Sequence, residues 1–404
     1  MKGVVAAVLT VVACASSASG ASAATVKRPT YTSREETVSS PYVVVHYTRT
    51  GPDHPRFMKD DDHNGVPNYI QKLAAAANKA WLWYAHNGFK APLPDKAGPD
   101  SKLDIYVKAL PQGEYGVTYP ATVGEGGTFL VIDNQLDEAH LAQHGSLQQT
   151  VAHELFHAFQ LSYVPDGNIP AWAAEGSATA MQTYVYPQIA DAATFEYLDA
   201  WLMQPWRSLE DQAQGCVHCY GGALFWRFVF HLGDHVMSDY FGRLYGYEHA
   251  NRRILDGLQP LDEVLQKDVE GGSLYSVFTR FAYDVYRSNY RPAAAYSLTA
   301  SPSIRTTQVR VVRGLSTHYV PIAVPTGARR IGVGIGAAGG PNPEVKLVVG
   351  GPKGRVVEGV LRDHGHLQYF MTRFRTARER SNVVLIITSG REVGTAYRIA
   401  YQAM

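Results

Sequence analysis

Two histidines one helical turn apart, followed by a glutamate less than twenty residues later, constrain this chain more than any other feature. His153 and His157 are the first and last residues of the segment HELFH, and Glu175 lies in the segment WAAEG at residues 172–176. Residues four apart share one face of a helix, so both imidazoles can bind the same metal ion. Glu154 lies beside them, where it can take a proton from a bound water. A carboxylate from Glu175 would complete a two-histidine, one-glutamate zinc (Zn²⁺) site with an open fourth position, which predicts a zinc hydrolase.

The histidine spacing alone is not diagnostic, because the pairs His140/His144 and His231/His235 share it. Neither pair has a glutamate after its first histidine, and we interpret both as structural. A complete HExxH in a chain of this length is expected by chance roughly a few times in a hundred. Apolar residues around the motif predict a buried helix, in which Glu154 without a metal would be a costly unpaired charge.

The first residues predict export. Met1–Ala23 has a lysine near its start, a short apolar run and a small-residue cleavage site, as a signal peptide does. The alternative is a lipoprotein signal, because residues 11–14 resemble a lipobox, and Cys14 would then hold a lipid anchor on the outer face of the cell membrane. No later segment is long and apolar enough to be transmembrane. We therefore expect a secreted, extracellular protein.

Length and periodicity predict two domains of α+β class. After a short segment at 24–40, residues 41–292 are expected to form a mainly helical domain with a small mixed sheet. Its predicted strands are 41–48, 103–109 and 128–133, and its predicted helices are 68–86, 136–161, 173–186, 220–232, 238–245, 261–267 and 273–288. Short alternating runs separated by turns predict an antiparallel β-sandwich at 301–404.

The total charge is nearly balanced, with 37 Lys and Arg against 36 Asp and Glu. This balance gives no sign of a nucleic-acid or anionic-membrane partner. The mature chain would hold two cysteines, Cys216 and Cys219, and in an oxidising compartment we expect a local disulfide between them. His218 between them keeps metal binding open as the second interpretation.

A segment rich in side-chain oxygens precedes the first predicted helix. Asp60, Asp62, Asn64 and Asn68 are candidate calcium (Ca²⁺) ligands, because oxygens at alternate positions with a glycine at the sixth resemble the start of a calcium loop. The twelfth position is Gln71 instead of a bidentate glutamate. A turn that caps the following helix is the other interpretation, and both stay open.

The motifs together resemble the gluzincin metallopeptidases, the clan of thermolysin and the aminopeptidases. The chain is more similar to a group of poorly characterised secreted bacterial metalloproteases with an AHExxHAxQ helix and a WxxEG helix, over roughly Tyr42–Tyr286. This resemblance implies a zincin-like catalytic domain in which His153, His157 and Glu175 bind zinc and Glu154 is the catalytic base.

Related patterns fit less well. The metzincin motif is excluded, because Gln160 and Tyr163 stand where its glycine and third histidine belong. The GxMEN strand of the aminopeptidases is absent, so an endopeptidase is favoured. The gap from His157 to Glu175 is slightly shorter than in thermolysin, which requires a tight connection.

Three further positions are assigned roles at the expected site. Tyr220 resembles the tyrosine that begins a helix in aminopeptidase-like gluzincins, and it is the candidate catalytic donor to the oxyanion. Thr179 is a candidate hydrogen-bond partner for a ligand histidine. Phe129–Ile132 is a candidate edge strand for pairing with an extended peptide. A purely structural role explains Tyr220 at least as well and is favoured for Thr179, and core packing explains Phe129–Ile132 nearly as well.

The leading hypothesis is a secreted zinc-dependent peptidase with a C-terminal accessory β-sandwich and a peptide or protein substrate. The alternative is a non-catalytic secreted protein, in which a structural zinc domain accompanies a sandwich that binds polysaccharide or cell wall. The presence of Glu154 argues against this alternative, because a structural zinc site needs no base.

Overall fold

The computed structural model describes most of the chain. The described residues are 26–96, 100–120, 127–137, 146–188, 192–233, 235–249, 257–288, 290, 292, 294, 297–337, 344–362 and 367–404. The predicted signal peptide, Cys14, His140 and His144 lie outside them.

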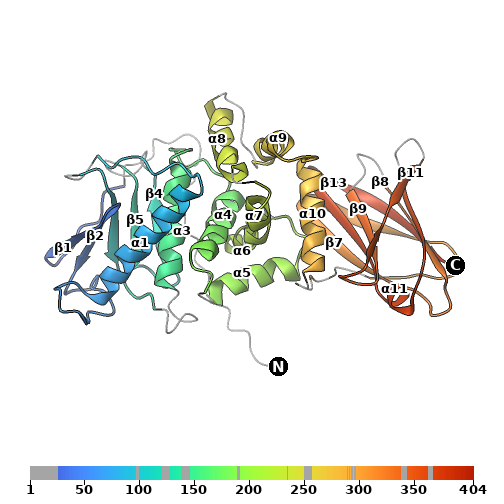
Figure 1. The fold of residues 1–404 in the computed structure, drawn as a ribbon, viewed down its shortest axis with the longest axis horizontal. Coiled ribbons are helices and arrows are strands. Elements are labelled where there is room, and N and C mark those ends of the chain that lie inside the picture. The colour runs from blue at the N-terminus through green and yellow to red at the C-terminus, as the bar shows by residue number, and fades with distance from the viewer. Residues whose placement is uncertain are drawn as a thin grey trace. The chain divides into compact units, whose positions relative to one another are not determined.

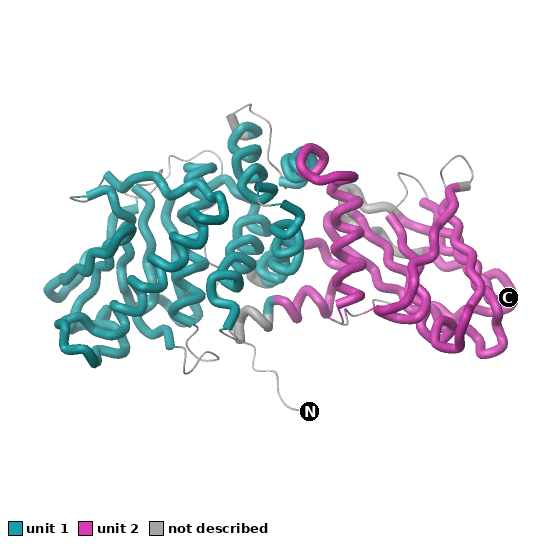
Figure 2. Tube along the Cα trace, in the orientation of Figure 1, with its two compact units in different colours: residues 1–197, 212–264 teal, residues 198–211, 265–404 magenta. Residues whose placement is uncertain are grey.

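Contacts between Cα atoms divide the chain into two compact units (Figure 2). Unit 1 contains residues 1–197 and 212–264, and unit 2 contains residues 198–211 and 265–404. This division differs from the predicted boundary at 292–301, because the segment from residue 265 to the sandwich groups with the sandwich.

Unit 1 contains a five-stranded mixed sheet in the order β1-β2-β3-β5-β4 (Figure 1). The strands are β1 (Glu35–Ser39), β2 (Val43–Thr48), β3 (Leu103–Lys108), β4 (Gly116–Tyr119) and β5 (Phe129–Asp133). Parallel pairing joins β2 to β3 and β3 to β5, while β1 and β4 pair antiparallel at the two ends.

The edge strand next to β5 is β4, which the sequence did not predict. The expectation that Phe129–Ile132 forms an edge is therefore wrong, since β5 has a neighbour on each side. Every residue of β5 is buried, as a strand inside a covered sheet requires.

The helix that contains HELFH packs on the sheet beside helix α1. Helix α1 (Asn68–His86) has the predicted bounds, and α3 (Leu147–Leu161) contacts α1, β4 and β5. Phe159 makes edge-to-face contacts with Trp81 and Tyr84, with ring centroids 5.3 Å apart in both pairs. The hydroxyl of Tyr84 donates to the carbonyl of Ala152 at 2.8 Å. These contacts fix the position of the motif against a buried core.

Helix α3 begins later than predicted. The expected start was Leu136, but Leu136 and Asp137 are not helical and the helix starts at Leu147. Ser146 is the N-cap, and its side chain accepts a hydrogen bond from the backbone N–H of Gln149. This cap satisfies one of the free N–H groups of the first turn.

Helix α4 (Ala171–Val185) packs on α3. The predicted helix at 220–232 is two helices, α6 (Ala213–Gly221) and α7 (Ala223–Phe230), separated at Gly222. The others are α5 (Ala192–Met203), α8 (Val236–His249) and α9 (Leu258–Asp268).

Gly176 of the WAAEG segment allows α4 to approach α6 and α7 closely. A Cβ at this position would lie 2.7 Å from Cδ1 of Trp226 and 2.9 Å from the carbonyl oxygen of Cys219. Neither neighbour can move easily inside a packed core, so the residue after Glu175 must be glycine.

Unit 2 contains the expected sandwich-like β-structure. Its strands are β6 (Leu298–Thr299), β7 (Arg305–Ala323), β8 (Arg330–Ala337), β9 (Glu344–Val349), β10 (Arg355–Val357), β11 (Gly359–Arg362), β12 (Leu367–Arg373) and β13 (Val383–Ala403). Apart from the short parallel pair β6–β7, all pairings are antiparallel. The chain is thus α+β with a β-sandwich-like part.

Two long strands connect the layers of the sandwich. Strands β7 and β13 pair along their lengths, with irregular register near Arg391 and Thr395. The first part of β13 also pairs with β9, and its last part pairs with β8. Apolar side chains from these strands, including Val320, Leu347 and Ile399, form a shared core.

Helix α10 (Leu274–Arg287) belongs to unit 2 because it packs on strands of the sandwich. The hydroxyl of Tyr319 donates to the carbonyl of Ala282 at 2.8 Å, and the hydroxyls of Thr279 and Thr388 are 2.5 Å apart. Among the described residues, no helix combines the length and apolar character needed to cross a membrane.

Truncation of Phe159 should destabilise the helix that carries the motif. Phe159→Ala removes a fully buried ring, and we expect a loss of about 3–5 kcal/mol in the free energy of unfolding. Leu82→Ala on α1 is the control, because Leu82 is 55% exposed and should change stability by less than about 0.5 kcal/mol. Chemical denaturation measures both, and equal losses would contradict this account of the core.

Candidate metal centre

Three ligand atoms from α3 and α4 converge on one point. The Nε2 atoms of His153 and His157 are 3.1 Å apart. Oε2 of Glu175 lies 3.1 Å from Nε2 of His153 and 3.5 Å from Nε2 of His157. All three side chains are buried. The structure therefore brings together the three residues that the sequence assigned as ligands.

The separations match those of a tetrahedral zinc site. Nitrogen and oxygen ligands at the usual distances of about 2.0–2.1 Å from zinc are about 3.3 Å from one another at tetrahedral vertices. The observed separations of 3.1, 3.1 and 3.5 Å lie around this value. Two imidazoles and a carboxylate are also the ligand types that zinc prefers. The residues present fit the ion that the motif implies.

Two glutamines turn the histidines toward this point. Nδ1 of His157 is 2.8 Å from Oε1 of Gln160, and Nδ1 of His153 is 2.8 Å from Oε1 of Gln182. The amide nitrogen of Gln160 donates to the carbonyl of Ala174 at 3.0 Å. Because the amide nitrogen of Gln160 is used in this bond, the atom that faces His157 is the amide oxygen. An oxygen can only accept, so His157 must donate from Nδ1.

This orientation leaves the lone pairs of Nε2 facing one another. A neutral His157 that donates from Nδ1 has no proton on Nε2. The two Nε2 atoms and Oε2 of Glu175 are then three acceptors within 3.5 Å of one another. Such an arrangement needs a cation or an additional proton among the three atoms. Glutamine amides that hold the far nitrogen of ligand histidines are typical of metal sites.

The charges of the cluster are strongly coupled. Burial opposes the charged form of His157, but the charge of Glu175 and its hydrogen bond outweigh burial and raise the pKa of His157 to about 9. Burial likewise opposes the charged form of Glu175, but the two histidines lower its pKa to about 2. The carboxylate therefore stays ionised, as a metal ligand must be.

Glu154 lies beside the three converging atoms and is held by β4. One ligand atom from each of His153, Glu154 and His157 lies within 4.8 Å of the others. The hydroxyl of Thr118 donates to Oε2 of Glu154 at 2.7 Å. Burial raises the pKa of Glu154. The sequence did not identify Thr118, because nothing in the short segment GVTY marks it as a strand beside the motif.

The close approach of β4 to Glu154 requires Gly116. A Cβ at residue 116 would lie 2.6 Å from Cγ of Glu154 and 3.1 Å from its carboxylate carbon. Glu154 would have to move to accommodate any larger residue. Gly116 and Thr118 thus act together, the first by leaving room for the carboxylate and the second by bonding to it.

Tyr220 lies next to His153, as a candidate donor to the oxyanion must. Its ring stacks on the ring of His153, with centroids 6.0 Å apart, and on the ring of Tyr197 at 4.5 Å. Burial, followed by the nearby charge of Glu175, raises the pKa of Tyr220 well above its usual value. The hydroxyl is therefore protonated and close to the site.

The disulfide expected from the sequence is present in the helix that carries Tyr220. Cys216 and Cys219 are bonded, with their Cα atoms 5.0 Å apart. Both belong to α6, whose last residues are Tyr220 and Gly221. The bridge therefore limits the conformations of the turn that precedes Tyr220.

Thr179 is not the partner of a ligand histidine, so that expectation is wrong. Its side chain is buried, and its Oγ1 has no hydrogen-bond partner among the described residues. Gln182 takes the role instead, seven residues after Glu175 and on the same face of α4. Gln160 is three residues after His157, and its spacing could have identified it from sequence.

The oxygens of the segment before α1 mostly bind within the segment itself. The carboxylate of Asp60 accepts from the N–H groups of Asn64 and Gly65, and Asp62 accepts from Asn64 and Gln71. Asn68 bonds to the backbone and side chain of Asp61. These bonds are those of a turn, and calcium binding by Asp60, Asp62, Asn64 and Asn68 stays a prediction.

Comparisons with known proteins identify no family for the whole chain. No protein family matches the sequence, and no curated protein matches it. Solved structures similar to part of the chain include the pre-peptidase C-terminal domain of a collagenase from Bacillus anthracis, at 10% identity and a TM-score of 0.20. A second is CsCBM6-3 from Clostridium stercorarium in complex with cellobiose, at 10% identity and a TM-score of 0.16. They cover 26% of this chain and 94% and 95% of their own chains.

Replacement of Gln182 should weaken zinc binding. Gln182→Met removes the acceptor for Nδ1 of His153 while keeping a similar volume, and we expect a 10- to 100-fold loss of zinc affinity. Competition with a chromogenic chelator measures it. Thr179→Val, one helical turn away, removes a hydroxyl without a partner and should leave the affinity unchanged. If both variants bind zinc as the wild type does, the assigned role of Gln182 is incorrect.

Proposed function

We propose that this chain is a zinc-dependent peptidase, with His153, His157 and Glu175 as zinc ligands. The observation that carries the proposal is the convergence of three acceptor atoms within 3.5 Å of one another, next to a buried carboxylate that bonds to none of them. A structural zinc site closes its fourth position with another protein ligand and has no use for such a carboxylate. A hydrolase requires both the open position and the base.

The zinc ion and the side chains of the protein would supply different parts of the hydrolytic chemistry. A zinc ion bound by these ligands supplies Lewis acidity, which acidifies water and polarises a carbonyl. Glu154 is suited to accept a proton at its carboxylate and to return it to a leaving amine, because burial raises its pKa above that of an exposed glutamate. Thr118 donates to Oε2 of Glu154. The other carboxylate oxygen, Oε1, is then left to accept and return the proton.

Tyr220 is proposed to donate a hydrogen bond to the oxyanion that forms during hydrolysis. Its ring stacks on the ring of His153, and burial and the nearby charge of Glu175 raise the pKa of its phenol. A protonated hydroxyl beside the proposed ligands is within reach of groups that occupy the fourth position. A protonated, preorganised donor is what oxyanion stabilisation requires.

The choice of a peptide as substrate rests on the edge of the sheet. Strand β4 pairs with β5 on one side only, and no other described strand pairs with it. An extended peptide can add to such an edge through main-chain hydrogen bonds. Since Gly116 and Thr118 of β4 contact Glu154, a peptide paired with β4 would lie beside the base. An endopeptidase is favoured, and secretion remains part of the proposal.

Glu154→Gln tests the proposed base. Wild-type protein should cleave casein or a quenched peptide library, lose this activity to a chelator and regain it with zinc. The variant should lose about 10²–10⁴-fold in kcat and keep its zinc and its melting temperature. Glu114→Gln is the control, since Glu114 lies before β4 and outside the site. Full activity of Glu154→Gln would refute the assignment of the base.

Tyr220→Phe separates two roles of the phenol. If the hydroxyl stabilises the oxyanion, kcat should fall by about 10²–10³-fold with zinc affinity unchanged. If the hydroxyl only positions Glu175, zinc affinity should fall instead. Tyr69→Phe is the control, because it removes a buried hydroxyl that bonds to the carbonyl of Asp133, away from the ligands. Steady-state kinetics and chelator competition distinguish the outcomes.

A further inference from the structure

The charge of the chain is distributed very unevenly along the sequence. Residues 301–404 contain 15 Lys and Arg against five Asp and Glu. In the rest of the chain Asp and Glu outnumber Lys and Arg, so the near-neutral total charge conceals a strongly basic sandwich. Such an asymmetry indicates an anionic partner for the basic part.

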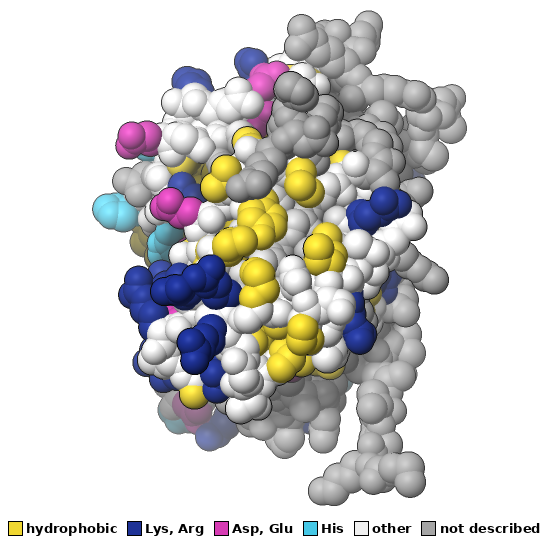
Figure 3. All heavy atoms as spheres, turned by 90° about the vertical axis from the view of Figure 1, so that its right-hand side faces the viewer, with side chains coloured by type: hydrophobic (Ala, Val, Ile, Leu, Met, Phe, Trp, Pro, Cys, Tyr) yellow, Lys and Arg dark blue, Asp and Glu magenta, His cyan; other side chains and the backbone are white. Residues whose placement is uncertain are grey.

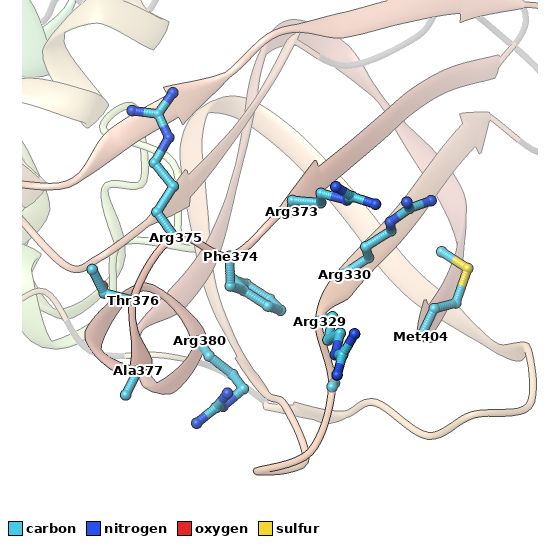
Figure 4. A pocket seen from close by; sticks show the side chains of 10 residues that line it. Arg329, Arg330, Arg373, Phe374, Arg375, Thr376, Ala377, Arg380 and Met404 are labelled. Carbon is cyan, nitrogen blue, oxygen red and sulfur yellow. The ribbon is translucent and has the colours of Figure 1, made fainter.

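The arginines gather at one cavity of the sandwich. A cavity of about 660 Å³ is lined by Arg329, Arg330, Arg373, Arg375 and Arg380, together with Phe374 and a few small or apolar residues. Figure 4 shows four of the guanidinium groups around the ring of Phe374, while the side chain of Arg375 extends away from them. Among the described residues, no Asp or Glu lines the cavity.

None of the five guanidinium groups has an ion pair with a described carboxylate. The nearest acidic residue in sequence is Glu379, which bonds to Nε of Arg355 at 2.9 Å and to the backbone N–H of Arg375 at 2.6 Å. The hydrogen bond with Arg355 lowers the pKa of Glu379. Its carboxylate oxygens thus accept hydrogen bonds from Arg355 and from the backbone of Arg375, and its charge also attracts the guanidinium of Arg375.

Two of the arginines face each other across strands. Arg330 of β8 is directly opposite Arg373 of β12 in the antiparallel register. Like charges at directly opposed positions destabilise a sheet. A bound anion would remove this repulsion, and the pair is therefore better explained by a ligand than by folding.

We propose that this cavity, which we call the arginine cavity, binds an anionic glycan whose sugar units carry carboxylate or sulfate groups. Guanidinium groups pair with such oxyanions through two parallel hydrogen bonds. The half-buried ring of Phe374 and the small apolar residues beside it offer a surface for the C–H faces of a sugar ring. The volume falls within the range of ordinary ligand pockets.

The shape of the cavity disfavours nucleic acid. Duplex readout needs a helix or ribbon that protrudes into a groove, whereas this site is concave. Single strands are bound by several aromatic side chains along a basic groove, whereas Phe374 is the one aromatic residue in the lining. On the face drawn in Figure 3, Lys and Arg side chains form a group beside a hydrophobic region, a combination that suits sugar units with charged substituents.

Binding of the full-length protein to defined polymers tests the proposal. The probes are heparin, which carries sulfate, and polygalacturonate, which carries carboxylate, with dextran as the neutral polymer and a single-stranded DNA as the competing polyanion. Arg330→Gln combined with Arg373→Gln removes two charges from the cavity. Arg305→Gln combined with Arg398→Gln removes two charges from exposed positions that do not line it.

The proposal expects binding to heparin, polygalacturonate or both, with weakening at high salt and none to dextran. The polymer that binds more tightly identifies the oxyanion. The cavity variant should lose at least tenfold in affinity with an unchanged or raised melting temperature, and the control variant less than about twofold. Equal losses in the two variants, tighter binding of the DNA, or no binding to either glycan would each overturn the proposal.

Discussion

The convergence of His153, His157 and Glu175 is the constraint on which the rest of unit 1 depends. Three ligand atoms at such short separations need a cation or an additional proton among them, so other parts of the unit must hold them in place. Helix α3 is held by aromatic contacts with α1, and α4 is brought close by Gly176. Gln160 and Gln182 then fix the rings. Free energy from packing is thus used to keep an otherwise unfavourable cluster together.

Strand β4 connects this cluster with the proposed chemistry. It is the edge of the sheet and also the element that contacts Glu154 through Gly116 and Thr118. The sheet positions the proposed base Glu154, whereas helices α3 and α4 position the three proposed ligands, so the two can be positioned independently. Such a division leaves the carboxylate of Glu154 bonded to Thr118 while the three proposed ligand atoms converge beside it.

Unit 2 has a different electrostatic character. Its sandwich is rich in arginine, and the arginine cavity brings together five of these residues, none of which forms an ion pair with a described carboxylate. The near-zero total charge gave no sign of a nucleic-acid or anionic-membrane partner, but a total over the whole chain does not show where the charges lie. Charge counted over each unit would have revealed the asymmetry from sequence, although the cavity itself depends on the pairing of β8 with β12.

The sequence by itself determined the features that depend on local spacing: the helix at 68–86, the pair of histidines four residues apart on one helix face, the disulfide between Cys216 and Cys219, and the β-rich C-terminal part. These follow from the periodicity of helices and strands and from short covalent distances. Only the tertiary structure decided that β4 is the edge strand, that Gln182 instead of Thr179 supports His153, and that Arg330 opposes Arg373. These features depend on which distant segments pack together, and the few polar residues involved carry no periodic signal that would reveal their partners.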